Sequence, residues 1–230
     1  RAPEQLSVLF IGEDSRNPRV RALEQRARQL GVRIVSEARS ALDRRSDGER
    51  HQDVLAEFTP DNIHGEKELD RLLGNISGDP LILVLDGVQD PHNLGACLRA
   101  ADAAGVGPVI LPKDRSAPLT PVARRAASGA AEVLPILLVT NLARVLGQLK
   151  ERGVWLAGTT DQADSDLYGT DLTGPLALVV GSEGQGMRRL TAELCDYRVR
   201  IPMACTVSSL NVSVAAAVCL FDILRQRSLK

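Results

Sequence analysis

The chain has 230 residues, of which 44% are hydrophobic and 25% are charged. This is the composition of an ordinary globular protein, and it excludes a largely disordered, collagen-like or coiled-coil chain. The net charge of −1 excludes a uniformly basic coat for nucleic acid but leaves room for a local basic patch. Only 3% of the residues are aromatic, too few for a platform that stacks several bases.

Targeting and metal-binding signals are missing from the sequence. No apolar run reaches the roughly 18 residues of a membrane helix and no signal peptide opens the chain, so we expect a cytoplasmic protein with no membrane partner. Four cysteines are scattered without a CxxC motif or a Cys/His cluster, which indicates reduced thiols and no metal site. These are Cys97, Cys195, Cys205 and Cys219. The first residue is Arg rather than Met, and we expect a piece of the natural chain to precede it.

The first 60 residues alternate strand-like and helix-like patterns. Apolar runs predict strands at 6–11, 32–35 and 54–58, and a helical spacing predicts a helix over 19–30 that stops at Gly31. Between residues 16 and 50 lie ten arginines and five acidic residues, a net charge of +5. Two interpretations stay open: a solvated helix face, or a surface whose guanidinium groups contact nucleic-acid phosphates.

A polar, glycine-containing segment separates this region from the rest, and we predict a linker at 61–80. From residue 81 onward, strands and helices alternate. Strands are predicted at 81–85, 109–111, 134–139, 154–157, 176–180 and 199–201, and helices at 94–104, 141–152, 188–195 and 210–226. The alternation predicts an α/β fold with a mostly parallel sheet covered by helices on both faces.

The last predicted helix is apolar on most sides, so it must be buried. Either it packs inside one subunit, or a second copy of the chain covers part of it.

Three segments that follow predicted strands are rich in glycine or small polar residues. They are residues 86–99, 181–187 and 202–211. Because ligands bind outside the carboxyl ends of parallel strands, these segments together form one candidate site. The glycines of the second segment have the spacing G-x-x-G-x-G, which is neither a dinucleotide fingerprint nor a phosphate loop, but they let a backbone approach a flat ligand closely.

Polar side chains in these segments have several interpretations. Glu183 either accepts hydrogen bonds from a ligand or ties down its turn, and the residue pattern favours the second role. A lone His92 is more often structural than catalytic. Asn93 is suited to cap the following helix, while Arg99, among small apolar residues, calls for an anionic partner such as a phosphate or a carboxylate.

Together, the three segments resemble the ordered motifs of the SpoU/TrmH family of RNA 2′-O-ribose methyltransferases, within the SPOUT superfamily. The motifs read DPHNLGACLR at 90–99, VGSEGQGM at 180–187, and IPM at 201–203 leading to VSSLNVSVA at 207–215. The resemblance covers roughly residues 81–227. Further segments, including SDG at 46–48, PKDRSA at 112–117 and GAAE at 129–132, are similar to the family members that methylate a guanosine ribose in the peptidyl-transferase region of 23S rRNA.

The resemblance implies a fold that periodicity does not predict. The expected architecture is a SPOUT catalytic and dimerisation domain at 81–230 with a trefoil knot, whereas patterning alone favours an unknotted sheet. Residues 1–60 resemble the family's L30e-like RNA-binding domain, with its first strand and helix missing. The implied partners are 23S rRNA and a second copy of the chain, with no DNA.

The resemblance also implies the site residues. S-adenosyl-L-methionine (AdoMet) would contact Gly181, Ile201 and Leu210, with help from Thr159, Met203 and Ser209, and no metal is needed. The implied catalytic set is Asn93, Arg99, Glu183, Ser209 and Asn211. Arg99 is the family's proposed base, but a guanidinium stays protonated in proteins, so we favour a role in gripping an RNA phosphate and stabilising the developing alkoxide.

Three rival functions follow from the same residues. The nearest is a methyltransferase of the same family that acts on tRNA, and another is an RNA-binding homologue without catalysis. A nicotinamide-dependent enzyme is disfavoured because no glycine fingerprint follows the first strand.

Overall fold

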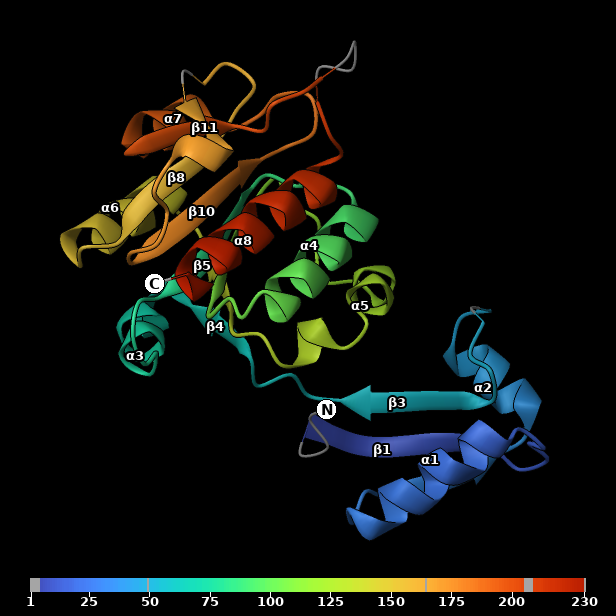
Figure 1. Ribbon diagram of the computed structural model, residues 1–230. Helices are drawn as coiled ribbons and strands as arrows, with labels where there is room; N and C mark the ends of the chain where they lie inside the picture. Colours follow the sequence, from blue (N-terminus) through green and yellow to red (C-terminus); the bar gives the residue numbers. More distant parts are fainter. Residues whose placement is uncertain (1–4, 49, 164, 205–208, 230) are drawn as a thin grey trace. The chain divides into compact units, whose positions relative to one another are not determined.

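The computed structural model describes residues 5–48, 50–163, 165–204 and 209–229 (Figure 1). The chain divides into two compact units, Arg1–Asp61 and Asn62–Lys230.

The smaller unit is a three-stranded sheet with two helices. Strand β1 (Leu6–Gly12) lies in the middle, parallel to β2 (Ile34–Glu37) and antiparallel to β3 (Val54–Phe58). Helix α1 (Pro18–Gln29) begins after Asn17, whose side chain accepts a hydrogen bond from the Arg19 amide at 3.0 Å. Helix α2 (Arg39–Arg45), which the sequence pattern missed, follows β2. The small core contains Leu9, Ile11, Val20 and Ala27.

The larger unit contains an eight-stranded parallel sheet in the order β4-β7-β6-β5-β10-β8-β11-β9. The strands are β4 (Ile63–Gly65), β5 (Leu81–Asp86), β6 (Val109–Pro112), β7 (Ile136–Val139), β8 (Trp155–Thr159), β9 (Ser165–Asp166), β10 (Leu176–Gly181) and β11 (Tyr197–Arg200). The predicted α/β fold with a parallel sheet is therefore confirmed. The trefoil knot stays a prediction.

Helices cover both faces of this sheet (Figure 1). On one face pack α4 (Pro91–Ala103), α5 (Pro121–Ala127) and α8 (Val212–Ser228). On the other pack α3 (Leu69–Gly74), α6 (Leu142–Glu151) and α7 (Arg189–Leu194). Successive side chains of β5 alternate between the two cores, because a strand points neighbouring residues to opposite faces. This double coverage explains why β5 and β10 are continuous apolar runs, fully buried along their length.

The predicted linker at 61–80 is folded instead. Strand β4 pairs with β7 through Ile63 and Ile136, and α3 buries Leu69 and Leu72 in the core of the larger unit. The boundary between the units accordingly falls after Asp61. Polar composition is a poor guide here, because a three-residue edge strand needs few apolar side chains to be held in place.

The side chain of Asn62 holds the start of β4 against the segment that precedes β7. Its buried side-chain amide donates to the carbonyl oxygens of Ala131 and Leu134, both at 2.8 Å. Replacing Asn62 with alanine leaves two buried carbonyls without this donor, so we expect the free energy of unfolding to fall by about 2 kcal/mol in denaturant titrations. The exposed Asn75, changed to alanine, is the matched control. Equal stability of the two variants would contradict this structural role.

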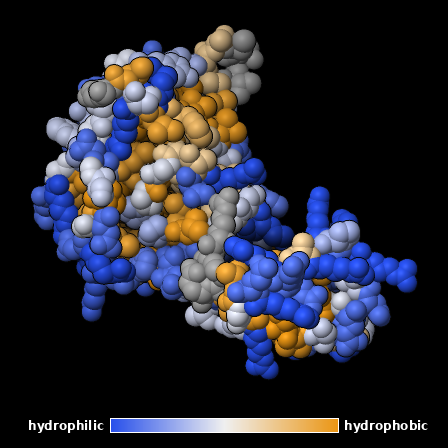
Figure 2. Space-filling view, turned by 60° about the horizontal axis from the view of Figure 1, so that its bottom comes forward, coloured by the Kyte–Doolittle hydropathy of each residue, from blue (hydrophilic) through white to orange (hydrophobic). Residues whose placement is uncertain are grey.

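Helix α8 is only partly buried by the chain to which it belongs. Val212, Ala216, Cys219 and Ile223 lie in the core, while the side chains of Val214, Phe221 and Leu224 are 46%, 48% and 39% exposed. Figure 2 shows apolar residues gathered on one side of the larger unit, bordered by hydrophilic ones. Among the described residues, no helix is long and apolar enough to span a membrane.

Candidate active site

The candidate site lies where the central strands β5 and β10 end. These two strands pair in register up to Asp86 and Gly181, so the segments that follow them leave the sheet side by side. The strand order also changes direction here, since β6 continues on the far side of β5 and β8 on the far side of β10. Such a switch point is the usual place for a ligand in an open parallel sheet.

Asp90, rather than Asn93, caps helix α4. Its carboxylate accepts a hydrogen bond from the His92 amide at 2.8 Å, and Pro91 occupies the first turn. The prediction that Asn93 caps this helix is therefore wrong. Both residue types cap helices well, and the proline, which favours the first helical position, fixes the start one step earlier. The Asn93 side chain is left available for other contacts.

The segment after β10 folds into a closed turn. Ser182 and Gly186 exchange two backbone hydrogen bonds of 3.0 Å each, which returns the chain close to Gly181. An ideal Cβ atom at Gly181 would lie 2.1 Å from the Gly186 carbonyl carbon. The turn holds Glu183 exposed at its tip.

Hydrogen bonds connect the three predicted segments. The Asn93 amide donates to Glu183 Oε1 at 2.6 Å, and the Asn211 amide donates to Asn93 Oδ1 at 3.0 Å. Asn211 also caps α8, because its Oδ1 accepts hydrogen bonds from the Ser213 amide and hydroxyl at 2.9 and 2.6 Å. Three segments distant in sequence thus converge, as predicted.

This chain of hydrogen bonds has a defined direction. An ionised Glu183 only accepts hydrogen bonds, so Asn93 must turn its NH₂ group towards it and its oxygen towards Asn211. Asn211 in turn presents its NH₂ group to Asn93 and its oxygen to the start of α8. Each amide is fixed in one orientation by its neighbours, and donors that align in this way reinforce one another.

Two members of the predicted catalytic set, Arg99 and Ser209, take no part in the hydrogen bonds that connect Asn93, Glu183 and Asn211. Arg99 is exposed on α4 and forms no hydrogen bond or ion pair with a described residue, so the structure offers it no carboxylate partner. Ser209 is exposed two residues before Asn211. The neighbouring motif positions 205–208, including Cys205, lie outside the described residues.

The residues predicted to contact AdoMet lie along the same edge of the sheet. Thr159 ends β8, Gly181 ends the adjacent β10, and Ile201 follows β11 on the other side of β8. Ile201 and Leu210 are half-buried and Met203 is 39% exposed, while Pro202–Ala204 belong to no helix or strand. Apolar side chains, backbone outside helices and strands, and the Glu183 carboxylate suit a nucleoside that carries a sulfonium cation. These residues therefore fit AdoMet.

The Cys97 thiol, on α4 near the site, is unreactive. Burial raises the pKa of the Cys97 thiol to about 12, and the negative charge of Glu183 adds to this effect. Cys97 therefore stays protonated and is no nucleophile at neutral pH. Within the described residues, no group of three His, Cys, Asp or Glu side chains is arranged to hold a metal ion.

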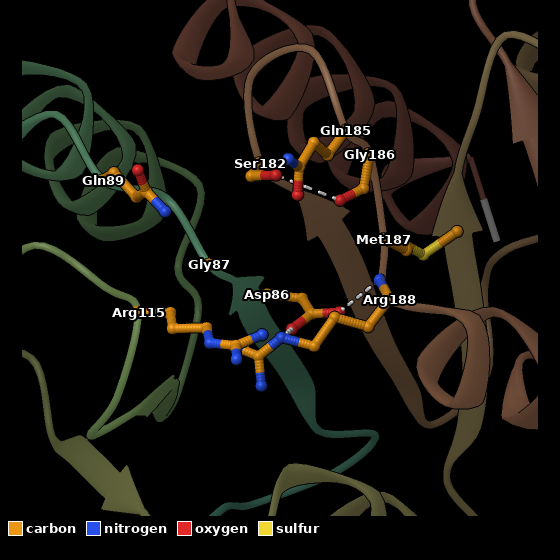
Figure 3. Close-up of a pocket in the computed structure, with 9 residues that line it drawn as sticks. All are labelled: Asp86, Gly87, Gln89, Arg115, Ser182, Gln185, Gly186, Met187 and Arg188. Carbon is orange, nitrogen blue, oxygen red and sulfur yellow. Dashed lines mark hydrogen bonds and ion pairs between the residues drawn. The ribbon is translucent and has the colours of Figure 1, made fainter.

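A polar pocket adjoins the site and was missed by sequence reasoning (Figure 3). It lies between the segments after β5, β6 and β10, and its polar lining includes Asp86, Gln89, Arg115, Ser182, Gln185 and Arg188. The fully buried Asp86 carboxylate accepts a hydrogen bond from the Arg188 amide at 2.9 Å and pairs with Arg188 Nε at 3.2 Å. The only available signal was an aspartate ending an apolar strand, a common place for a functional carboxylate.

Comparison with known proteins identifies the family. The SpoU rRNA Methylase family matches residues 80–221, and a domain described as RNA 2'-O ribose methyltransferase substrate binding matches residues 1–64. The chain belongs to the SpoU rRNA methylase family. The match over residues 80–221 includes the three motifs that Asn93, Glu183 and Asn211 connect.

Named members of the SpoU family are similar over nearly their whole length. The 23S rRNA (guanosine-2'-O-)-methyltransferase RlmB of Pseudomonas syringae is 54% identical over 99% of this chain and 91% of its own length. The protein of the same name from Escherichia coli is 50% identical over 99% of this chain and 93% of its own. The SpoU methyltransferase AviRb of Streptomyces viridochromogenes, solved with AdoMet, matches with a TM-score of 0.81 and 28% identity over 100% of this chain and 87% of its own.

Proposed function

We propose that the protein transfers the methyl group of AdoMet to the 2′-hydroxyl of a guanosine in 23S rRNA. The observation that carries this proposal is the hydrogen-bonded connection of Asn93, Glu183 and Asn211 at the ends of the central strands, in a SpoU family chain. Relatives at 50–54% identity, each named a 23S rRNA methyltransferase, favour this substrate over tRNA. Retention of the polar site residues favours an enzyme over a non-catalytic homologue. The proposed substrate places the protein in the cytoplasm.

The chain's residues divide the chemical task. AdoMet, when bound, supplies an electrophilic methyl group on a sulfonium. Gly181, Ile201 and Leu210 bind it, and the negative charge of Glu183 favours a cation nearby. The fixed amides of Asn93 and Asn211 hold the Glu183 turn against α4 and α8, so that the bound groups keep one geometry. Arg99 places a permanent positive charge where the ribose oxygen becomes an alkoxide, and the hydroxyl proton leaves to solvent.

The arginines of the smaller unit support RNA binding. Of the ten between residues 16 and 50, three are paired with a described residue: Arg45 pairs with Glu37 at 2.8 Å and lies over the Phe10 ring, Arg28 pairs with Glu24, and Arg39 lies 3.8 Å from Asp53. The remaining ones are exposed and have no ion pair with a described residue. These are Arg16, Arg19, Arg21, Arg26, Arg33, Arg44 and Arg50. Unpaired guanidinium groups are suited to contact phosphates without reading sequence.

The function is tested by incubating the protein with radiolabelled AdoMet and either a 23S rRNA transcript or bulk tRNA. We expect label in the rRNA, at one guanosine that resists alkaline cleavage because its 2′-oxygen is methylated. Label in tRNA alone would show that the substrate is tRNA, as in the rival function. Binding of AdoMet without transfer to either RNA would contradict the proposed activity.

The active form is a dimer that buries the exposed side of α8. Val214 and Phe221 are two turns apart on one side of this helix, and Leu224 follows one turn later, so they form a continuous apolar strip. We expect Phe221→Glu to shift the protein from dimer to monomer in sedimentation experiments at micromolar concentration, because the charge would be desolvated at the interface. Leu23→Glu, on an exposed leucine of the smaller unit, is the matched control. A dimeric Phe221→Glu variant would contradict this interface.

A further inference from the structure

The polar pocket beside the site has a size suited to a single chemical group. Its volume is about 110 Å³, well below the roughly 300–1,000 Å³ of typical small-molecule sites. It shares two segments with the active site, because Gln89 precedes Asn93 at the start of α4 and Ser182 precedes Glu183 in the closed turn. A group bound there lies next to the reacting centre without competing for the space of a whole cofactor.

The charges in the pocket do not balance. Among the described residues, its lining carries the guanidinium groups of Arg115 and Arg188 but a single carboxylate, that of Asp86. That carboxylate is fully buried and engaged by the amide and the Nε of Arg188. Arg115 is exposed and has no ion pair with a described residue. One positive charge is left for a ligand, and Figure 3 shows both guanidinium groups on the same side of the pocket.

Three residues of the lining approach Gly87 closely. An ideal Cβ atom at Gly87 would lie 3.4 Å from the Arg115 carbonyl oxygen, 3.7 Å from Arg188 Nη2 and 3.8 Å from Ser182 Cβ. A glycine at this position keeps the space open. The side-chain amides of Gln89 and Gln185 add uncharged donors to the same lining, whereas the Ser182 hydroxyl donates to the Gly186 carbonyl at 3.3 Å.

The segment that carries Arg115 is held in an unusual conformation. Arg115 has a φ of 58°, in the left-handed region that non-glycine residues rarely adopt. Its segment is tied to its neighbours, since the Ala117 amide donates to the Val88 carbonyl at 2.8 Å and Arg188 Nη2 donates to the Asp114 carbonyl at 3.4 Å. Such local strain persists where surrounding contacts enforce it, and it commonly marks a functional position.

We propose that this pocket is a phosphate subsite in which Arg115, with Arg188, holds the RNA backbone beside the ribose to be methylated. The inference rests on the proposed function and adds to it a positioning residue distinct from Arg99. The uncompensated guanidinium group of Arg115, with that of Arg188 beside it and the side-chain amides of Gln89 and Gln185, matches the oxygens of a phosphodiester. The other anion available to this enzyme, the carboxylate of AdoMet, shares part of that chemistry and is separated from RNA by the test.

The test variant is Arg115→Asn, because asparagine tolerates the left-handed backbone while removing the charge. Arg188 is left intact, because its loss would leave the buried Asp86 carboxylate without its ion-pair partner. The matched control is Lys113→Asn, an exposed cation of the same segment that does not line the pocket. Arg115→Lys restores the charge without the guanidinium fork. For each variant of the 230-residue chain, we measure affinity for a 23S rRNA transcript at several salt concentrations and affinity for AdoMet by calorimetry.

We expect Arg115→Asn to weaken RNA binding about tenfold and to reduce the slope of log K against log salt by roughly 0.7–0.9, the loss of one phosphate contact. AdoMet affinity should stay that of the wild type, and Arg115→Lys should recover the slope. RNA affinity and slope equal to those of Lys113→Asn would overturn the proposal, as would a loss of AdoMet affinity, which would assign the pocket to the cofactor. A wild-type protein that binds rRNA without methylating it would refute the proposed function, while the binding comparison would still decide on the subsite.

Discussion

Replacing Arg99 with alanine is expected to lower kcat by roughly 10²–10³-fold, the usual cost of losing one donor that stabilises a developing oxyanion. Arg99 is exposed and bonds to no described residue, so its removal should leave stability and AdoMet affinity unchanged. Single-turnover methylation of a 23S rRNA transcript, with calorimetric titration of AdoMet, measures both quantities.

Two further variants sharpen this prediction. Arg99→Lys keeps a positive charge but loses the guanidinium fork, and it should recover only part of the rate. Arg198→Ala removes another exposed arginine of the larger unit, on β11, and should retain wild-type turnover. Unimpaired turnover in Arg99→Ala would remove this residue from the mechanism.

Replacing Gly181 with alanine is expected to weaken AdoMet binding at least tenfold and to lower the free energy of unfolding by about 1–3 kcal/mol. The added methyl group would lie 2.1 Å from the Gly186 carbonyl carbon and 2.2 Å from the Met187 nitrogen, so the closed turn has to open. Opening the turn displaces Glu183 from Asn93. Calorimetry and denaturant titration record the two effects.

Gly169→Ala is the matched control for this substitution, because a Cβ atom at Gly169 meets nothing within 4 Å. This variant should bind AdoMet and unfold as the wild type does. A Gly181→Ala protein with wild-type affinity would show that the turn is not held against Gly181 in solution.

Apolar patterning predicts the central architecture well for a physical reason. Strands β5 and β10 are covered by helices on both faces, so nearly every position must be apolar and the run is visible in the sequence. The convergence of the three segments then follows from topology, since the ends of neighbouring parallel strands lie at one edge. Glu183 illustrates both interpretations made from sequence, because it ties its turn to Asn93 and stays exposed at the candidate site.

Features that depend on tertiary contacts cannot be predicted from the apolar pattern of the sequence. Strand β4 has three residues and is held by pairing with β7 and by Asn62, neither of which has a local signature. The cap of α4 is decided between two residues that cap equally well. Arg115 and Arg188 line one pocket although they follow different strands, so only the fold shows that the carboxylate of Asp86 pairs with Arg188 and leaves the charge of Arg115 uncompensated.

The bond between Asn93 and Asn211 spans 118 residues of sequence and has a consequence for how activity arises during folding. The glycine turn and the start of α4 are built on the sheet itself, whereas Asn211 arrives only when α8 docks. A partly folded molecule with a finished sheet but an undocked final helix thus has two of its three linked polar groups. Methyl-transfer competence should appear late in refolding, in step with burial of α8 rather than with formation of the sheet.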